Sequence, residues 1–390
     1  MQDPDRWWHR FHYEDWVARE GLELIRGHQV SDVFTVPLRH WARTDGYAVH
    51  IELDGASEQA AAYVQEIPPA GKLNPIRHVY EELVFVLSGR GSTSVWFDEN
   101  EKRSFEWGPW SLFAIPLNAW YQHFNVSGTE PARYIALTTA PTMMNFIRND
   151  DFIFDNPFLF TDRFDEAQDY FNREAKERIY ERVPGVSGAG SAYFANYWPD
   201  VKRVFDRPRG ERVRDFNPET DRRLTDGERG GGYQFEPADG VLGAHISVTP
   251  AGSFTSVHRH GPAAHVLWLQ GGGYSILWPD GGEANKVKED WQPGTLIVPP
   301  NWWWHGHCVT SREDGRFIAL KLSSRKNMVS RTHELTTVSR RQHPNGQSVG
   351  FSDLPQETLA ELKQIFVDEC AKQGTPLDPR MGRIFEQMGV

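Results

Sequence analysis

The chain has 390 residues, with 42 Lys and Arg against 53 Asp and Glu, so its formal net charge is −11. At about 100–200 residues per domain this length predicts two domains, and the acidic balance argues against nucleic acid or an anionic membrane as partner, because phosphate groups would repel the chain. A charged fraction of 24% and an aromatic fraction of 13% indicate a folded globular protein.

The cellular setting is predicted from cysteines and apolar runs. Two cysteines, Cys308 and Cys370, cannot form a disulfide framework and suit a reducing compartment. No apolar run reaches the roughly 18 residues that would cross a bilayer, and the N-terminal segment lacks the charged-then-apolar order of a secretory signal. We expect a cytoplasmic protein.

Helical spacing of apolar residues is rare along the chain. It is found at residues 13–25, again at 164–180, and at 354–372, where a proline stands at an early helical position. Short β-branched or aromatic runs bounded by Gly, Pro or Asp predict strands at 134–138, 274–279, 295–299 and 317–322. The pattern predicts an all-β fold of sandwich or barrel type with a few flanking helices.

The chain also contains an internal repeat. Residues 77–89 followed by 108–125 match residues 258–272 followed by 294–309: in both, an apolar strand ends in Gly and a later strand from Gly to Pro leads into Trp and His. Gly89 pairs with Gly272 at an offset of 183, and Pro116 pairs with Pro300 at an offset of 184. Two landmarks that agree within one residue predict a duplicated domain.

Five histidines of the second repeat fall within fifty residues: His258, His260, His265, His305 and His307. Because side chains alternate along a strand, His258 and His260 share a face, and so do His305 and His307. Buried imidazoles need partners, and a divalent metal such as Fe, Zn, Cu or Ni would supply one. The spacing predicts a metal site in this repeat.

These motifs resemble those of the cupin superfamily. The second repeat has His258-x-His260, then His265 where the motif has Glu, then Gly272, Gly294, Pro300 and His305. The run Pro300-Asn301-Trp302-Trp303-Trp304-His305-Gly306-His307 resembles the second motif of the gentisate 1,2-dioxygenase-like bicupins.

The resemblance implies two tandem cupin barrels of the double-stranded β-helix, or jelly-roll, type. We expect an N-terminal arm (residues 1–45), an N-terminal barrel (46–145), a connecting arm and linker (146–240), a C-terminal barrel (241–325) and a C-terminal extension with a helix (326–390).

The resemblance also implies roles for single residues. The metal ligands would be His258, His260 and His305, and His307 would be a catalytic acid/base or substrate contact. His265 would be a catalytic residue in contact with the substrate, a fourth ligand or a packed core residue. Trp268 and Trp304 would line the substrate site, with barrel core and subunit interface as the alternative.

The first repeat departs from the motif. Ile76 and Tyr121 replace two of the expected histidines, whereas His78, Glu82 and His123 remain. We therefore expect no tight metal site in the N-terminal barrel. Val266 in the second repeat stands where gentisate dioxygenases carry an arginine that can anchor the substrate carboxylate, which counts against gentisate itself.

Three neutral imidazoles leave a divalent ion its full charge and open positions, as in non-haem iron oxygenases. The main hypothesis is therefore an Fe(II) dioxygenase, an oxidoreductase that uses O2 to cleave the ring, or a related carbon–carbon bond, of a small hydroxylated aromatic or chelating organic acid. The alternatives are a lyase, decarboxylase or isomerase with Mn, Ni, Zn or Fe, and a non-catalytic small-molecule-binding bicupin. The apolar segment 151–160 predicts subunit contact in a homo-oligomer.

Overall fold

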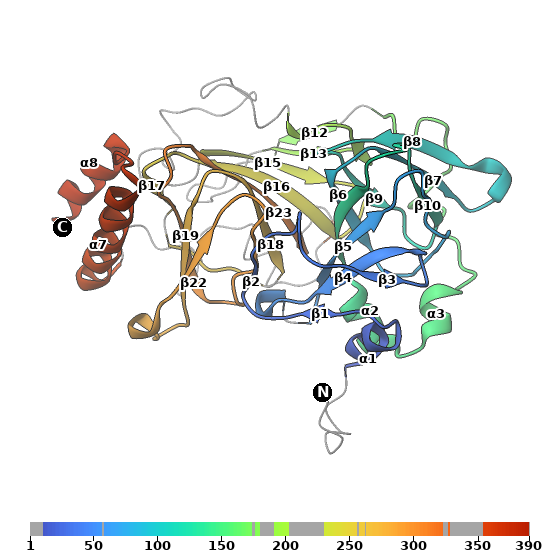
Figure 1. The fold of residues 1–390 in the computed structure, drawn as a ribbon, viewed down its shortest axis with the longest axis horizontal. Coiled ribbons are helices and arrows are strands. Elements are labelled where there is room, and N and C mark those ends of the chain that lie inside the picture. Colours follow the sequence, from blue (N-terminus) through green and yellow to red (C-terminus); the bar gives the residue numbers. More distant parts are fainter. Residues whose placement is uncertain are drawn as a thin grey trace, which may run out of the picture.

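Two β barrels lie side by side in the computed structural model, with helices at the outer flank of each (Figure 1). The structure describes residues 11–56, 58–173, 176–179, 191–202, 230–255, 257–261, 263–322, 327 and 354–389. The residues between these ranges include 203–229 of the predicted linker and most of 323–353. The all-β class and the two tandem barrels predicted from the sequence are confirmed.

The N-terminal barrel consists of two facing sheets. The larger has the order β1-β4-β5-β11-β6-β9-β14 with β3 paired to β4, and the smaller has the order β10-β7-β8. The strands are β1 (Leu24–Ile25), β3 (Arg39–Trp41), β4 (Gly46–Ile51), β5 (Ala61–Ile67), β6 (Glu82–Ser88), β7 (Gly91–Trp96), β8 (Arg103–Trp107), β9 (Leu112–Ile115), β10 (Trp120–Asn125), β11 (Ala132–Thr138) and β14 (Tyr197–Trp198).

The C-terminal barrel repeats this plan. Its larger sheet has the order β12-β13-β15-β16-β23-β18-β21-β2, and its smaller sheet has the order β17-β22-β19-β20. The strands are β2 (Gln29–Val30), β12 (Lys176–Ile179), β13 (Ser191–Phe194), β15 (Gly230–Glu236), β16 (Leu242–Thr249), β17 (Ser253–Phe254), β18 (Ala264–Gln270), β19 (Gly273–Trp278), β20 (Val287–Trp291), β21 (Leu296–Ile297), β22 (Trp304–Val309) and β23 (Gly315–Leu322).

Each barrel has an edge strand that comes from a segment outside the barrels. Strand β2 comes from the N-terminal arm and pairs with β21 of the C-terminal barrel, whereas β14 comes from the connecting segment and pairs with β9 of the N-terminal barrel. Each of these strands covers an edge that would otherwise expose unpaired backbone groups.

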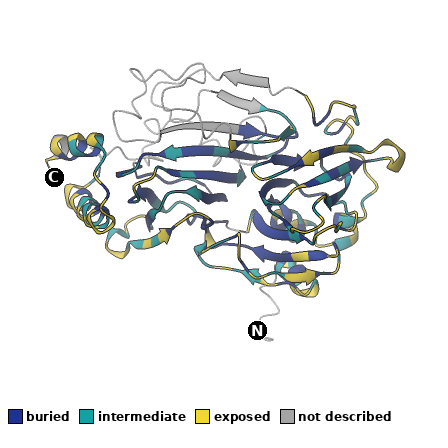
Figure 2. Ribbon diagram, turned by 45° about the horizontal axis from the view of Figure 1, so that its top comes forward, coloured by how far each residue is buried: buried dark blue, intermediate teal, exposed yellow. Residues whose placement is uncertain are grey.

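The core also joins the barrels. One buried apolar cluster combines side chains of the larger sheet of the N-terminal barrel, such as Leu83 and Phe85, with side chains of the C-terminal barrel, such as Leu267 and Leu320. The interiors of the barrels hold separate clusters. Figure 2 shows the sheet strands largely buried, and exposed residues on the helices and connections.

The helices flank the barrels. Helices α1 (His12–Arg19), α2 (Ala140–Ile147) and α3 (Asp150–Phe154) belong to the N-terminal half, and α7 (Gln356–Gln373) and α8 (Pro379–Met388) lie against the outer face of the C-terminal barrel. Within the described residues, short 3-10 helices cover Asp54–Ala56, Glu99–Glu101 and Glu283–Asn285. The described residues contain no helix long and apolar enough to cross a membrane.

The helix at 354–372 is confirmed as α7, which follows Pro355 and ends at Gly374. The helix expected at 13–25 ends at Arg19, because Gly21 has a φ of 74° and β1 follows. The prediction of a helix at 164–180 is wrong. Glu166 has a φ of 48°, which interrupts a helix, and residues 176–179 form β12.

The strand pairing places the two repeats in a register that differs slightly from the sequence match. Gly89 has a φ of 78° and begins the turn into β7, and Gly271, with a φ of 79°, begins the equivalent turn into β19. Thr93 in β7 and Ser275 in β19 then occupy equivalent positions opposite His123 and His307. The offset is therefore 182 on these strands, so pairing Gly89 with Gly272 was wrong by one residue.

Candidate metal centre

His258 and His305 lie opposite each other in the C-terminal barrel. They form an isolated antiparallel bridge in which His258 N donates to His305 O at 2.9 Å and His305 N donates to His258 O at 2.8 Å. Residues paired in this way project their side chains to the same face, and the two ring centroids are 4.3 Å apart. The backbone itself therefore brings the first two imidazoles together.

Three buried histidines form a group suited to a metal ion. The ligand atoms of His258, His305 and His307 all lie within 4.8 Å of one another. His260 is outside this group, but its ring centroid is 4.7 Å from that of His305 and 5.8 Å from that of His258. The sequence thus predicted a cluster that the fold assembles, and the structure adds His307 to the candidate ligands.

Hydrogen bonds at Nδ1 orient these rings. His305 Nδ1 is 3.0 Å from the carbonyl oxygen of Trp303, and His260 Nδ1 is 2.9 Å from that of Gly261. A carbonyl only accepts, so Nδ1 carries the proton in both rings and Nε2 is the nitrogen that can bind a metal. Neutral imidazoles are ligands for most divalent transition metals, so the donor set fits such an ion.

His307 is oriented by a side chain. His307 lies opposite Ser275 across the β19–β22 pair, and Ser275 Oγ is 2.8 Å from His307 Nδ1. Thr93 and His123 make the same contact in the N-terminal barrel, with Thr93 Oγ1 2.7 Å from His123 Nδ1. The hydroxyl–imidazole pair is therefore a feature of both barrels.

His265 lies away from this cluster. It pairs with Leu320 in β23 and shares a face of β18 with Leu267, and both leucines belong to the core between the barrels. The interior face of β18 carries Val266 and Trp268 instead. Burial lowers the pKa of His265 to about 4, so the ring is neutral at pH 7. Among the described residues, no ring contact links His265 to the other four histidines, so the geometry does not support its predicted catalytic role.

The two predicted substrate-binding tryptophans are not equivalent. Trp268 is fully buried, stacks on Trp291 with centroids 3.4 Å apart, and lies 5.6 Å from the ring of His307. Trp304 alternates with His305 along β22 and packs toward the cluster formed with α7 and α8. Trp268 is thus a wall of the histidine cluster, whereas Trp304 faces away from it.

Trp304 instead contacts Arg259, the residue between His258 and His260. The Arg259 guanidinium lies 4.4 Å from the ring of Trp304 and pairs with Asp280 at 2.9 Å. Trp304 Nε1 donates to Asp280 Oδ1 at 3.0 Å. The hydrogen bonds from Arg259 and Trp304 hold the pKa of Asp280 below its usual range. Together these contacts link the His-x-His segment to β22.

Two polar residues of the interior face were missed in the sequence. His245 in β16 and Lys321 in β23 lie on the same face as Phe317 and Ala319, which belong to the interior cluster. The ring centroid of His245 is 5.6 Å from that of Phe317. The alternation of β23 itself could have identified Lys321, because it stands two residues beyond Ala319.

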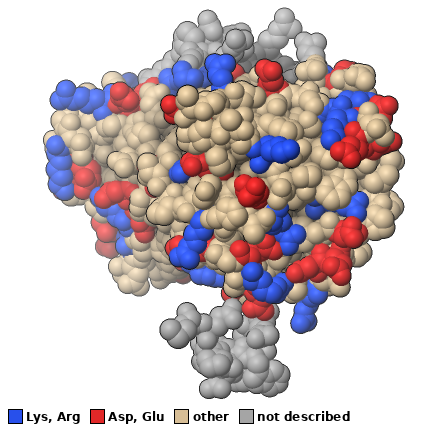
Figure 3. Space-filling model, turned by 45° about the vertical axis from the view of Figure 1, so that its right-hand side comes forward, with Lys and Arg blue, Asp and Glu red and all other residues tan. Residues whose placement is uncertain are grey.

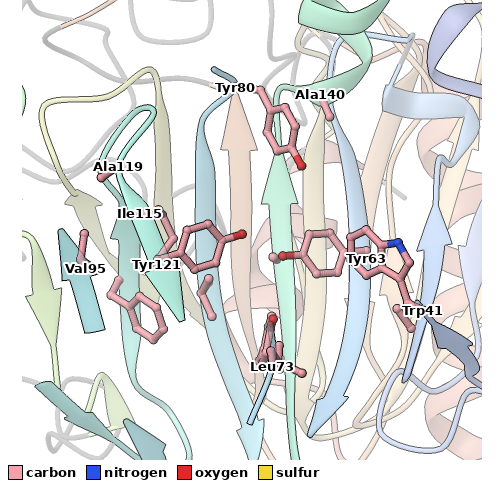
Figure 4. Packing of buried hydrophobic residues seen from close by; sticks show 14 of the residues in the cluster. Trp41, Tyr63, Leu73, Tyr80, Val95, Ile115, Ala119, Tyr121 and Ala140 are labelled. Carbon is pink, nitrogen blue, oxygen red and sulfur yellow. The ribbon is translucent and has the colours of Figure 1, made fainter. Parts of the chain in front are cut away.

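The N-terminal barrel has a closed polar cluster at the equivalent position. Tyr121 Oη donates to Glu82 Oε2 at 3.1 Å, and His78 Nε2 lies 3.2 Å from the same oxygen. Burial raises the pKa of Glu82, but hydrogen bonding and charge from His78 outweigh it, and the pKa is lowered. Figure 4 shows the hydroxyl groups of Tyr63, Tyr80 and Tyr121 pointing toward one central space. In the described residues, a group of metal-ligating side chains is found in the C-terminal barrel only.

Comparisons with known proteins return solved structures alone. The chain matches no protein-family model, and no curated protein matches it. A structure on the substrate binding mode of oxalate decarboxylase has a TM-score of 0.47 and 13% identity, covering 89% of this chain and 86% of that one.

A structure of Bacillus subtilis oxalate decarboxylase with Mn(II) centres has a TM-score of 0.47 and 14% identity, covering 87% and 84% of the two chains. A third, on proton-coupled electron transfer in oxalate decarboxylase, has a TM-score of 0.48 and 11% identity. Likeness at this level does not carry an activity, and the resemblance to gentisate dioxygenases is not confirmed.

Proposed function

We propose that this protein is a metal-dependent enzyme that cleaves a carbon–carbon bond, by decarboxylation, in a small carboxylic acid bound in the C-terminal barrel. The observation that carries the proposal is the group of three buried imidazoles, His258, His305 and His307, within 4.8 Å of one another. His260 stands beside them as a fourth imidazole.

The set of neutral imidazole ligands favours an anionic substrate. Imidazoles are neutral ligands, so an ion held by them keeps its full positive charge and attracts a carboxylate. When bound, a divalent ion acts as a Lewis acid that polarises the substrate and stabilises negative charge formed on it.

The packing of the two tryptophans near the histidine cluster is consistent with a small substrate. It favours the decarboxylase class over the Fe(II) ring-cleaving dioxygenase of the main sequence hypothesis. Trp268 is stacked on Trp291 and enclosed in the core, and Trp304 faces away, so neither offers a free surface to an aromatic ring. Trp268 and Phe317 pack against His307 and exclude water from it. Exclusion of water strengthens the electrostatic interactions within such a site.

His307 has a second candidate role, as a proton carrier. Its ring centroid is 5.7 Å from that of His305 and 6.1 Å from that of His258, and its Nδ1 is 2.8 Å from Ser275 Oγ. With His258, His260 and His305 as the residues that would hold the ion, His307 would return a proton to the carbon that loses the carboxyl group, as a general acid does. Substitution of His260 and of His307 distinguishes the third ligand from the proton carrier.

The test starts with metal content, measured by plasma mass spectrometry, for the wild type and for His305→Ala, with His265→Ala as the matched control. We expect about one equivalent of metal per chain in the wild type and in His265→Ala, and loss of the metal in His305→Ala. Absence of metal from the wild type, or metal unchanged in His305→Ala, would overturn the proposal.

The second stage measures carbon dioxide release and oxygen consumption with small dicarboxylic and keto acids, and with hydroxylated aromatic acids. Carbon dioxide release from an aliphatic acid, without stoichiometric oxygen consumption, supports the proposal. Stoichiometric oxygen uptake with an aromatic acid would instead establish the dioxygenase hypothesis.

A further inference from the structure

Arg259, in the middle of the His-x-His segment, contacts two tryptophan rings. Its guanidinium carbon is 4.4 Å from the ring centroid of Trp304 and 5.7 Å from that of Trp302. Both tryptophans precede His305 in the chain. A guanidinium over an aromatic ring is attracted by the negative face of the ring, and the attraction is stronger where water is excluded.

Asp280 binds both partners of the closer contact. Arg259 Nη1 pairs with Asp280 Oδ2 at 2.9 Å, and Trp304 Nε1 donates to Asp280 Oδ1 at 3.0 Å. Acidic and basic side chains are intermingled over the face drawn in Figure 3, and an exposed ion pair contributes little by itself. Arg259 differs from such a surface pair, because it is only 8% exposed and its guanidinium packs on the rings.

The same arginine–tryptophan contact is present in the N-terminal barrel. The guanidinium carbon of Arg77 is 4.9 Å from the ring centroid of Trp120, and Arg77 pairs with Asp155 at 2.7 Å. Arg77 precedes Arg259 by 182 residues and Trp120 precedes Trp304 by 184, the offsets of the equivalent strands. Asp155 follows α3, so the carboxylate comes from a different element than in the C-terminal barrel. The arginine on its tryptophan is therefore the shared feature.

A backbone hydrogen bond accompanies the contact in both barrels. Trp302 N donates to His260 O at 3.1 Å, and Asn118 N donates to His78 O at 3.0 Å. Both donors have a left-handed backbone, with a φ of 62° at Trp302 and 57° at Asn118. Asparagine tolerates this region, whereas a bulky residue rarely adopts it. The strained backbone at Trp302 is thus held by the hydrogen bond and by the contact of its ring with Arg259.

These contacts act on the part of the site that the strand pairing does not fix. His258 and His305 are joined by their own backbone bridge. His260 lies beyond that bridge, one residue past Arg259, and its ring centroid is 4.7 Å from that of His305. The position of His260 therefore depends on Arg259 and on the hydrogen bond from Trp302. A metal site requires its ligands to be held within about 0.5 Å of the productive geometry.

We propose that Arg259 is a positioning residue of the metal centre, which holds His260 beside His305 in the arrangement that a shared ion requires. The inference rests on the proposed function, because it assumes that the histidine cluster binds metal. Arg259 acts from outside the cluster, since its partner Trp304 faces away from the imidazoles. Its side chain therefore does not compete with them for the ion.

Titration of the full metal-free chain with cobalt(II) tests the proposal. Competition with a chelator measures the affinity, and the visible absorption of bound cobalt(II) reports the arrangement of its ligands. We expect Arg259→Gln to weaken the affinity about 10–100-fold, as loss of an orienting partner does, and to change the absorption spectrum. Arg77→Gln is the matched control, because it removes the equivalent contact in the N-terminal barrel, and it should change neither.

Arg259→Lys adds a second arm. It keeps the positive charge but lacks the planar group that reaches the ring and the carboxylate together, so we expect it to recover part of the affinity lost in Arg259→Gln. Circular dichroism of the metal-free variants establishes that each is folded. Affinity and spectrum unchanged in Arg259→Gln, or affinity weakened equally by Arg77→Gln, would overturn this inference alone. A wild type that binds no cobalt(II) would overturn the proposed function and this inference with it.

Discussion

Ile76 and Tyr121 form in the N-terminal barrel the isolated antiparallel bridge that His258 and His305 form in the C-terminal barrel. The backbone that brings two imidazoles together is therefore present in both halves. In the N-terminal half the position of His305 is taken by a phenol, whose hydroxyl donates to Glu82 at 3.1 Å. The difference between the barrels at this point lies in two side chains.

Replacing these two side chains is expected to create a second metal site. In Ile76→His with Tyr121→His, the new imidazoles would join His78 and Glu82 and form a mixed imidazole and carboxylate donor set. We expect metal content to rise from about one to about two equivalents per chain. Ile76→His alone is the control and should stay near one equivalent; a double variant that also stays there would contradict the prediction.

Ser275 is expected to support metal binding through His307. Ser275→Ala removes the hydroxyl at 2.8 Å from His307 Nδ1, and loss of such an orienting partner costs about 10–100-fold in metal affinity or activity. Competition with a chelator measures the change. Thr93→Ala removes the equivalent contact to His123 in the other barrel, so it should leave the affinity unchanged. Equal effects of the two substitutions would refute the assignment.

His265 is expected to destabilise the protein in acid. Its pKa is lowered to about 4 by burial, and its Nε2 has no hydrogen-bond partner among the described residues. Between its unfolded pKa near 6.5 and its folded pKa, the unfolded chain binds more protons, so this contribution to stability is lost as pH falls through that window.

His265→Leu places an apolar side chain beside Leu267 and Leu320. Thermal unfolding should show a smaller loss of stability between pH 6.5 and 4 than in the wild type, with metal content unchanged. A pH dependence as steep as that of the wild type would show that His265 is not responsible.

Glu52 is expected to have the opposite dependence on pH. Burial raises its pKa to about 7, although Arg26 at 3.2 Å lowers it. The folded chain then binds more protons than the unfolded chain between about pH 4.5 and 7, so stability is lost as pH rises through that range.

Glu52→Gln should therefore raise the free energy of unfolding above that of the wild type more at pH 8 than at pH 5. The difference between the two gains should be up to about 3 kcal/mol, and denaturant unfolding at both pH values measures it. Glu14→Gln is the control, because Glu14 also pairs with Arg26 but is 25% exposed. A similar gain in Glu14→Gln would attribute the effect to the ion pair and not to burial.

Local patterns in the sequence were enough to predict the β class, the duplication and the histidines of the second repeat. Alternation places His258 with His260 and His305 with His307 because side chains on a strand repeat with a period of two. The helix at α7 was predicted because its apolar stripe lies between Pro355 and Gly374. The prediction of a helix at 164–180 was wrong because Phe164 and Phe171 pack into the barrel core from a segment of turns and irregular structure. The spacing of apolar residues alone does not distinguish such packing from a helix.

The sequence by itself determined which residue types stand near the ends of the barrel strands, because the spacing of His-x-His and of the glycines and prolines that follow it can be read along the chain. The tertiary structure decided which of these side chains meet. The repeats align with an offset of 182 on β18 and β19 and 184 on β22, and an error of one residue reverses the face of a strand. Because of this difference of one residue, His265 faces the core between the barrels and not the metal cluster. The pairing of β18 with β23 shows which face His265 occupies.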